Sequence, residues 1–291
     1  GIRALLDDID GIGEVVAQAL LDFFAEPHID GLIGYAKVFH EAGVSWTISS
    51  YASEAANFGM FIGNYDNMQK VSMRVREAAI DLGVKRIIHG ECGHAWRVAY
   101  SFWNTLAGPF DFLDQNYPIP QHICEFTNDL LKRNKLRIDK SRNDHRVMTF
   151  HDSCNVARAS RMGDKAGGQF DIPREVIKAV CNNYVEMDQD TIKEGTYCCG
   201  GGGGILTDDL IEIRVKGALP RMQALHDVVE ENGVTNMAAI CAICKSQFSK
   251  VLPYYKMSMD MIVSVHQLVS DALILTGQKT DEDESKENES K

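Results

Sequence analysis

Five cysteines in three separate segments are the residues of this sequence that are best suited to chemistry. Cys154 is followed after 43 residues by the pair Cys198-Cys199, and after a further 41 residues by Cys241-x-x-Cys244. Five thiols exceed the four ligands of a tetrahedral zinc site, and an odd number cannot all pair as disulfides. A metal–sulfur cluster with more than four thiolate positions accommodates them, so the pattern predicts a redox protein.

A run of five glycines, Gly200 to Gly204, directly follows the cysteine pair. It fits neither the Walker phosphate loop, because Ile205-Leu206 stands where Lys and Ser or Thr are needed, nor the dinucleotide-binding pattern, because no clear strand precedes it. We expect the bare backbone at Gly200 and Gly201 to pack against a bulky cluster and to point amide N–H groups at sulfur. Such hydrogen bonds help to set the reduction potential of iron–sulfur clusters.

Other uses of the cysteines stay open from the residues alone. A single cysteine can be a small buried apolar residue, which we expect for Cys181 on a helical stripe with Ile177, whereas for Cys124 the two interpretations are balanced. Four of the thiols, or a set that includes His151, could bind zinc, although two adjacent cysteines rarely both reach one small ion. Cys241-x-x-Cys244 could also be a redox dithiol at a helix start, which would leave the other three cysteines unexplained.

Composition and charge exclude several classes of protein. The formal net charge of −11 argues against nucleic acid as the main partner. No signal peptide and no apolar run of about 18 residues is visible, which predicts a reducing compartment and no membrane span of its own. Residues 278–291 hold six acids, three lysines and no large apolar residue, and predict a disordered acidic tail. Because Gly1 begins inside helical-looking sequence, we expect an N-terminal part, able to carry further cofactors, to precede it.

Short apolar strands alternate with amphipathic helices along the chain, which predicts an α/β fold with parallel pairing. Residues 147–150 predict a strand that leads into Cys154, and residues 173–184 predict a helix whose apolar stripe includes Tyr184. Pro220 is expected to kink or interrupt the next helix. In this arrangement the cysteine segments lie at strand ends or loop-to-helix joints, where ligand sites gather in α/β folds.

The two halves of the sequence resemble each other weakly. In the second half an apolar run leads into Cys241-x-x-Cys244, and in the first half a similar run leads into His89-x-x-Cys92. Ser49-Ser50 stands 40 positions before His89, where the second half has Cys198-Cys199, 43 positions before Cys241. We therefore predict two pseudo-symmetric α/β halves with short parallel sheets flanked by helices, of which the first has kept its frame and lost most of its thiols.

The order C, CC-Gly, CxxC is similar to the CCG-domain signature of heterodisulfide reductase-type proteins. The five cysteines agree with it in order and approximate spacing, with slightly long gaps, and the resemblance extends over nearly the whole chain as a duplicated CCG module. The degenerate first half, residues 89–96 and Asn57-Phe58-Gly59 most resemble DsrK, the iron–sulfur subunit of the membrane complex of dissimilatory sulfite reduction, and its relative HdrD.

The resemblance implies a noncubane 4Fe–4S cluster, which cleaves disulfide-type bonds in two one-electron steps, bound by Cys154, Cys198, Cys199, Cys241 and Cys244. It also implies a cytochrome b-type membrane subunit that supplies electrons from quinol, and a DsrC-like sulfur-carrier protein that presents a disulfide or trisulfide. The chain would lie in the cytoplasm, peripheral at the inner face of the membrane. Family members usually carry cubane 4Fe–4S clusters on an N-terminal domain; no CxxCxxCxxxCP run occurs here, so that domain lies elsewhere or electrons enter differently.

This interpretation divides the chain into a degenerate module over residues 1–140, which would form the wall that meets the substrate or partner, and a cluster-binding module over residues 141–277. Candidates for catalysis near the lost site are His89, Cys92, His94 and Arg97. A histidine could protonate the leaving thiolate, and the arginine could hold a terminal carboxylate of the carrier. An electron-transfer subunit of another oxidoreductase complex and a zinc scaffold are the alternatives.

Overall fold

The computed structural model describes residues 29–49, 51–52, 56–117, 119–162, 165–166, 169–203 and 206–277. The predicted acidic tail lies outside these residues. Within the described residues, the first part of the chain forms seven elements: α3 (Ile29–Glu41), α4 (Ala56–Phe61), α5 (Tyr65–Asp81), β1 (Ile88–His89), α6 (Gly93–Ala107), β2 (Gln121–His122) and α7 (Ile123–Lys132).

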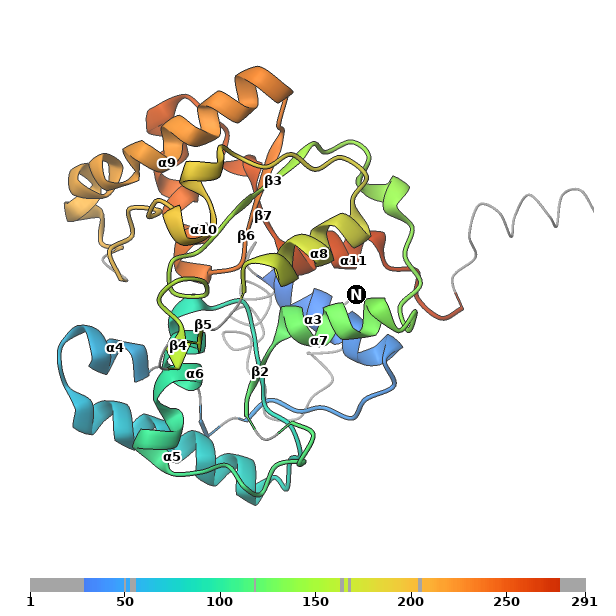
Figure 1. Ribbon diagram of the computed structural model, residues 1–291, viewed down its shortest axis with the longest axis vertical. Helices are drawn as coiled ribbons and strands as arrows, with labels where there is room; N and C mark the ends of the chain where they lie inside the picture. The colour runs from blue at the N-terminus through green and yellow to red at the C-terminus, as the bar shows by residue number, and fades with distance from the viewer. Residues whose placement is uncertain are drawn as a thin grey trace, which may run out of the picture.

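The rest of the chain carries a second sheet, a small hairpin and four more helices (Figure 1). Its strands are β3 (Met148–His151), β4 (Arg161–Met162), β5 (Lys165–Ala166), β6 (Asn236–Ala239) and β7 (Ile262–Ser264). Its α-helices are α8 (Asp171–Val180), α9 (Ile211–Asn232), α10 (Ala242–Val251) and α11 (Val265–Ala272). Short 3-10 turns connect them: η1 (Lys140–Asn143), η2 (Gln189–Thr191), η3 (Lys193–Gly195), η4 (Asp208–Leu210), η5 (Leu252–Tyr255) and η6 (Met259–Met261).

Both principal sheets are short and parallel, which confirms the predicted α/β fold. In the second half β6 lies between β3 and β7, and in the first half β1 pairs with β2. The order β1, α6, β2, α7 repeats as β6, α10, β7, α11, so each half contains the same strand–helix–strand–helix unit. Parallel neighbours need a crossover, and a helix supplies it here in both halves.

The repeat is real in element order, but its register differs from the one expected. The sequence comparison set His89 against Cys241, whereas His89 is the last residue of β1 and Cys241 is the N-cap of α10. Cys92 is the N-cap of α6. When the two helices are aligned at their N-caps, Cys92 corresponds to Cys241 and Ala95 to Cys244. Residues at the same distance from the N-cap occupy the same position on a helix.

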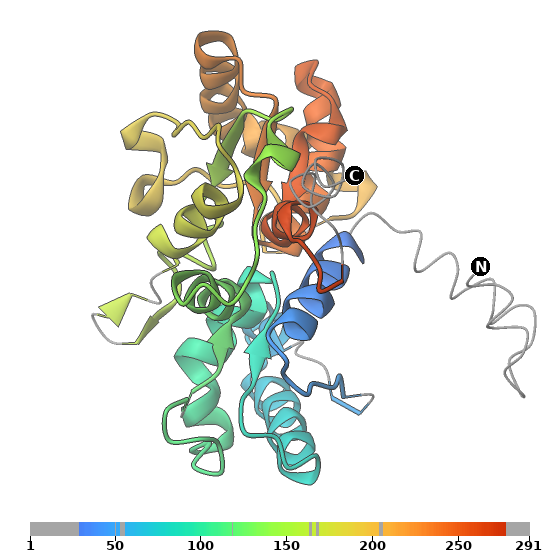
Figure 2. The ribbon, with the colours of Figure 1, turned by 90° about the vertical axis from the view of Figure 1, so that its right-hand side faces the viewer.

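Three hydrophobic clusters form the core. One joins the halves: it includes Trp96 and Ile123 from the first half and Phe150, Ile177 and Val265 from the second. The other two belong mainly to one half each. Figures 1 and 2 show α3, α7, α8 and α11 at the junction, where α11 packs against α3 and α8, and α7 against α8.

Two local predictions need correction. The predicted helix over 173–184 is α8, which ends at Val180; Tyr184 lies beyond it and forms a bridge with Met148. Helix α9 runs through Pro220 without interruption. Pro220 is exposed, so the carbonyl that loses its helical partner there can bond to water, which makes a proline in this position tolerable.

Candidate metal–thiolate site

The structure brings the three cysteine segments together. Side-chain hydrogen bonds join neighbouring thiols in the order Cys154, Cys198, Cys199, Cys244, Cys241. All eight cysteines of the chain are free of disulfide bonds. We call these five residues the thiol row. Cys154 and Cys198, at one end, are partly exposed, whereas the other three are buried.

Strand order explains why segments so far apart in sequence meet. Strand β3 pairs in parallel with β6, with His151 opposite Ala239. The turn that carries Cys154 and the helix start at Cys241 therefore leave the sheet at the same edge, where ligands bind in open α/β sheets. Cys198 and Cys199 arrive at this edge from the loop before α9.

The first two glycines of the run contact the cysteine pair. The amide of Gly200 donates to Sγ of Cys198 over 3.3 Å, and that of Gly201 to Sγ of Cys199 over 3.4 Å. Gly200 has φ of +88°, and a Cβ there would lie 2.4 Å from the carbonyl oxygen of Arg214 in α9. Only glycine fits both the backbone angle and the space.

Contacts within the thiol row favour thiolate at two of its members. Hydrogen bonds from Cys154 and Cys199 lower the pKa of the Cys198 thiol, and contacts with Cys244 and then with His94 lower the pKa of Cys241. The thiol pKa of Cys154 is raised, first by its hydrogen bond to Cys198. Hydrogen bonds to neighbouring thiols likewise raise the pKa of Cys199 and of Cys244. Thiolate is the form that binds metal, so Cys198 and Cys241 are the members whose surroundings favour it without a metal.

Buried polar atoms without partners surround the row and offer a test of whether a metal–sulfur group fits. His151 is fully buried with neither ring nitrogen hydrogen-bonded, and one guanidinium nitrogen of Arg214 and one of Arg221 are also unpaired. Burial lowers the pKa of His151. A thiolate-bound cluster offers sulfur acceptors and negative charge, which suits these donors and two buried arginines.

Five thiols are more than a single tetrahedral ion takes. Within the described part of the chain, no three His, Cys, Asp or Glu side chains are grouped as ligands of one metal ion would be. Cys154 and Cys241, the first and last thiols of the row, both lie near the Asn155–His94 pair, so the five thiols surround a common space that suits a group of several metal atoms.

Two helices of the first half cover the row. The ring of His94 in α6 places Nδ1 3.9 Å from Sγ of Cys241, and its Nε2 lies 2.9 Å from Nδ2 of Asn155. The ring of Phe61 in α4 contacts His94 edge to face at 5.0 Å between centroids, and it lies against Gly203 of the glycine run. Residues of the first half thus cover one side of the thiol row.

The other three candidates from the first half lie at different distances from the row. Arg97 donates to Oδ1 of Asn155 over 3.1 Å and so joins the same network as His94. His89 lies at the end of β1 with its ring against Trp96 and Trp103, and burial lowers its pKa to about 4. Cys92 caps α6 and is partly exposed.

The segment where the sequence comparison predicted a lost metal site, Ser49-Ser50, is described by the structure only in part. Ser49 accepts hydrogen bonds from the backbone amides of Tyr51 and Ala52, at 3.1 and 3.0 Å, as serine does in a tight turn. Ser50 lies outside the described residues. Of the remaining cysteines, Cys181 is buried in the core as expected, and Cys124 is fully buried there too.

Sequence reasoning missed a buried charged network beside Cys241. The carboxylate of Glu91 accepts hydrogen bonds from Lys245 (3.1 Å), from Ser264 (2.8 Å), and from both the backbone and Nδ1 of His266 (2.8 and 2.7 Å). Burial raises the pKa of Glu91, but Lys245 and His266 lower it more, and the result lies well below the usual value. Its only hint in the sequence is that Glu91 and Lys245 adjoin cysteines.

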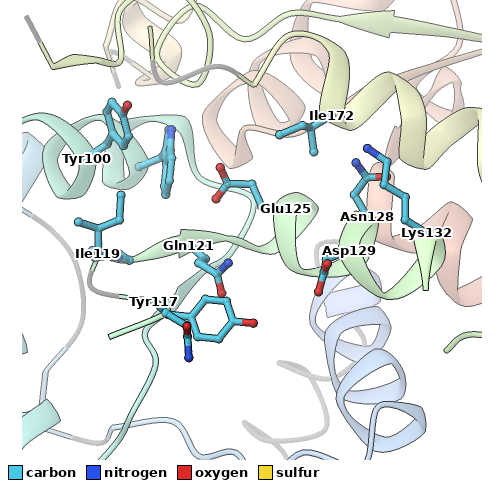
Figure 3. A pocket seen from close by; sticks show the side chains of 12 residues that line it. Tyr100, Tyr117, Ile119, Gln121, Glu125, Asn128, Asp129, Lys132 and Ile172 are labelled. Atoms are coloured by element: carbon cyan, nitrogen blue, oxygen red, sulfur yellow. The ribbon is translucent and has the colours of Figure 1, made fainter. Parts of the chain in front are cut away.

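Three cavities lie elsewhere. One of about 700 Å³ and one of about 370 Å³ lie along β1 and the segment 44–49. A third, of about 380 Å³, lies beside Trp96, with Tyr100 and Ile119 at one end and Asn128 and Lys132 at the other (Figure 3). None of the five thiols lines these three cavities. Titratable groups line two of them, Glu125 and Lys132 in one and His89 in another. The chemistry nevertheless indicates the thiol row, because five metal-binding thiols meet there and none lines these cavities.

Among the described helices, none combines the length and the apolar character that a membrane crossing requires.

Comparison with known proteins gives a family match over the region that contains the five thiols. Residues 148–249 match the family model for the cysteine-rich CCG domain. The chain is 39% identical to the Hdr-like menaquinol oxidoreductase iron-sulfur subunit of Archaeoglobus profundus and 37% identical to subunit 2 of the same description from Archaeoglobus fulgidus, each over 88% of this chain. It is 29% identical, over 68% of its length, to one subunit of the dihydromethanophenazine:CoB–CoM heterodisulfide reductase of Methanosarcina mazei, and it covers 43% of that subunit. The chain spans about half the length of the two Archaeoglobus relatives, 50% of each.

Proposed function

We propose that this chain is an iron–sulfur catalytic subunit that reduces a disulfide or trisulfide on a small sulfur-carrier protein. The chain contains a CCG cysteine-rich domain and is homologous to Hdr-like iron–sulfur subunits. The observation that carries this proposal is the thiol row itself: five contiguous thiols, two of them under glycine amides, with one partly exposed end.

The thiol row would hold a noncubane 4Fe–4S cluster, with Cys154, Cys198, Cys199, Cys241 and Cys244 as ligands. When bound, such a cluster supplies single electrons to a reaction that needs two. The amides of Gly200 and Gly201 already point at two of the ligand sulfurs, and the buried guanidinium groups of Arg214 and Arg221 compensate for negative charge.

With a disulfide, the overall reaction takes up two electrons and two protons, breaks one S–S bond and releases two thiols. With a trisulfide, the same two electrons and two protons break one S–S bond and release a thiol and a hydropersulfide. The partly exposed end at Cys154 and Cys198 is the side on which a substrate sulfur can approach. Of the first-half candidates, His94 is the one in contact with the row, at the buried Cys241, and its role as a proton donor to the substrate stays a prediction. Arg97 as a carboxylate-binding group, and His89 and Cys92 in catalysis, stay predictions.

The partners follow from the same proposal. A cytochrome b-type membrane subunit would supply electrons from quinol, a DsrC-like carrier would present the substrate, and cubane 4Fe–4S clusters would relay electrons between them. The subunit would work in the cytoplasm at the inner face of the membrane, as in DsrK-type complexes. These points go beyond the similarity to menaquinol oxidoreductase subunits and need separate tests.

The test is the iron and acid-labile sulfide content of anaerobically prepared protein, followed by EPR before and after oxidation with a disulfide. We expect about four iron and four sulfide per chain, and a paramagnetic species on oxidation that Cys198→Ala or Cys199→Ala abolishes. About one zinc without sulfide would overturn the redox proposal. A cluster that no disulfide affects would favour an electron-transfer subunit instead.

A further inference from the structure

We infer that Asn155 and Arg97 are positioning residues that hold His94 in one tautomer, with its Nδ1–H directed at the sulfur of Cys241. Three contacts carry this inference: Arg97 to Asn155 at 3.1 Å, Asn155 to His94 at 2.9 Å, and His94 to Cys241 at 3.9 Å. They form one chain from the guanidinium to the thiol row.

Arg97 determines which atom donates and which accepts in each of these hydrogen bonds. A guanidinium group has only donors, so the atom of Asn155 that faces it must be the acceptor oxygen Oδ1. Nitrogen and oxygen of an amide are otherwise hard to tell apart, and this contact settles which is which. The amide nitrogen Nδ2 of Asn155 therefore points the other way.

The amide nitrogen then fixes the histidine. Nδ2 of Asn155 can only donate, so Nε2 of His94, 2.9 Å away, must accept. A neutral imidazole carries one proton, which is then on Nδ1, the atom that faces Sγ of Cys241. The buried ring is held in this orientation by the edge-to-face contact with Phe61.

Asn155 also reaches the other end of the thiol row. Its Nδ2 lies 3.7 Å from Sγ of Cys154. Cys154 and Cys241 are the two ends of the row, so one amide group links both: directly to Cys154, and through His94 to Cys241. Asn155 is 8% exposed and His94 is 3% exposed, so little water competes for these hydrogen bonds.

The consequence for redox chemistry rests on the proposed function. A hydrogen bond donated to a ligand sulfur favours the more negative, reduced form of an iron–sulfur cluster and so raises its reduction potential. With the proton on Nδ1, His94 donates to Cys241. With the proton on Nε2, the ring would face the same sulfur with a lone pair, and this support for the reduced form would be lost.

The first experiment needs no cluster. We would label the full 291-residue chain with ¹⁵N, prepare it free of metal, and record two-bond ¹H–¹⁵N correlations of its histidine rings, with His94→Gln for assignment. We expect His94 to be protonated on Nδ1 alone. In Asn155→Asp the carboxylate keeps its contact with Arg97 but can only accept, so Nε2 should become protonated. A wild-type His94 protonated on Nε2 alone, or an unchanged tautomer in Asn155→Asp, would overturn the inference.

Arg97 gives a second series that does not depend on how well Asn155→Asp folds. Arg97→Lys keeps a donor toward Oδ1 and should leave the tautomer as it is, whereas Arg97→Met frees the amide to turn and should give a mixture of tautomers. An Arg97→Met spectrum identical to the wild type would contradict the role given to Arg97. Asn183→Asp, on the exposed surface, is the matched control and should not change the His94 signals.

The second readout is the midpoint potential of the reconstituted cluster. We expect it to be lower in His94→Phe than in the wild type and unchanged in Arg97→Lys. An unchanged potential in His94→Phe would remove the redox consequence and leave the tautomer result standing. A protein that binds no cluster would refute the proposed function alone, because the tautomer is measured without it.

Discussion

Gly93 and Cys241 lie so close that a Cβ atom on Gly93 would be 3.3 Å from the sulfur of Cys241. The same Cβ would lie 2.8 Å from Cγ2 of Val156. Gly93 is the first residue of α6, and Cys241 caps α10, so the equivalent helices of the two halves begin against each other. The thiol row is therefore sensitive to a single methyl group that comes from the other half.

Replacing Gly93 by alanine should disturb this contact. Although alanine is the better helix former, we expect Gly93→Ala to lower the free energy of unfolding by about 1–3 kcal/mol, as overpacking of a core does, and to reduce iron retention. Gly217→Ala is the control, because its Cβ would meet only ordinary contacts in α9, 3.4 Å from Gly200. Urea unfolding and iron analysis of both variants decide the matter; equal stabilities would contradict the clash.

The glycine run offers a second test that separates strain from crowding. Gly200 and Gly233 both have positive φ, +88° and +66°, but only at Gly200 would a Cβ collide with backbone, 2.4 Å from the oxygen of Arg214. Gly233→Ala should cost about 1 kcal/mol and keep the cluster. Gly200→Ala should cost clearly more and lose most of the iron. If both variants kept their iron equally well, the loop would not shape the site.

Removing one partner from the buried network of Glu91 should destabilise the protein. Glu91→Gln leaves the amine of Lys245, whose side chain is 17% exposed, without its charged partner. We expect a loss of about 3 kcal/mol, in the range found for broken buried pairs. Lys245→Met in the same background should restore part of it, because no unpaired charge remains. A double-mutant cycle by urea unfolding measures the difference, and strictly additive effects would refute the coupling.

Stability should fall as the pH drops below about 6.5. Burial lowers the pKa of His89 to about 4 and that of His122 to about 3. Below pH 6.5 these two histidines are protonated in the unfolded chain, whereas in the folded protein they stay neutral until the pH approaches 4. The free energy of unfolding therefore decreases as the pH falls from 6.5 toward 4. Between pH 7 and pH 5 each ring should account for about 2 kcal/mol.

Urea unfolding at the two pH values checks this dependence. His89→Phe should remove the contribution of one histidine to the change in unfolding free energy between the two pH values. His226→Gln, on the exposed face of α9, should leave that change as in the wild type. A His89→Phe protein with the full wild-type dependence would show that His89 does not contribute.

His151 should have opposite effects on the free and the metal-bound protein. Both of its ring nitrogens are buried without a partner, and its ring packs edge to face on Phe248 at 4.8 Å. His151→Phe removes two unsatisfied polar atoms and should stabilise the metal-free protein by about 1–3 kcal/mol. It should also weaken cluster retention. Phe248→Leu, which alters packing but not polarity, is the control, and parallel losses in both states would argue for packing alone.

The sequence predicted those parts of the site that depend on residues close together in the chain. Two of the three cysteine segments could be assigned to strand ends, because β3 and β6 are apolar runs that stop just before Cys154 and Cys241, and Gly200 could be expected at a crowded position. The register of the repeat could not be fixed, because β1 has only two residues and short strands carry little pattern.

Long-range contacts were beyond the sequence. Glu91 and His266 are 175 residues apart, and nothing in either neighbourhood indicates that they meet. Asn155 is an ordinary polar residue next to Cys154, and its importance appears only when the first half brings His94 and Arg97 to it. Folding creates these contacts through the parallel sheets and the shared core, and no local pattern encodes them.

The core shared between the halves also bears on how a duplicated protein can diverge. Trp96 and Ile123 of the first half pack into the same cluster as Phe150 and Val265 of the second. Deleting the first half would expose the interior of the second, whatever ligands the first half carries. This interdependence keeps the first half in the molecule independently of metal binding, and leaves its surface free to take up another role.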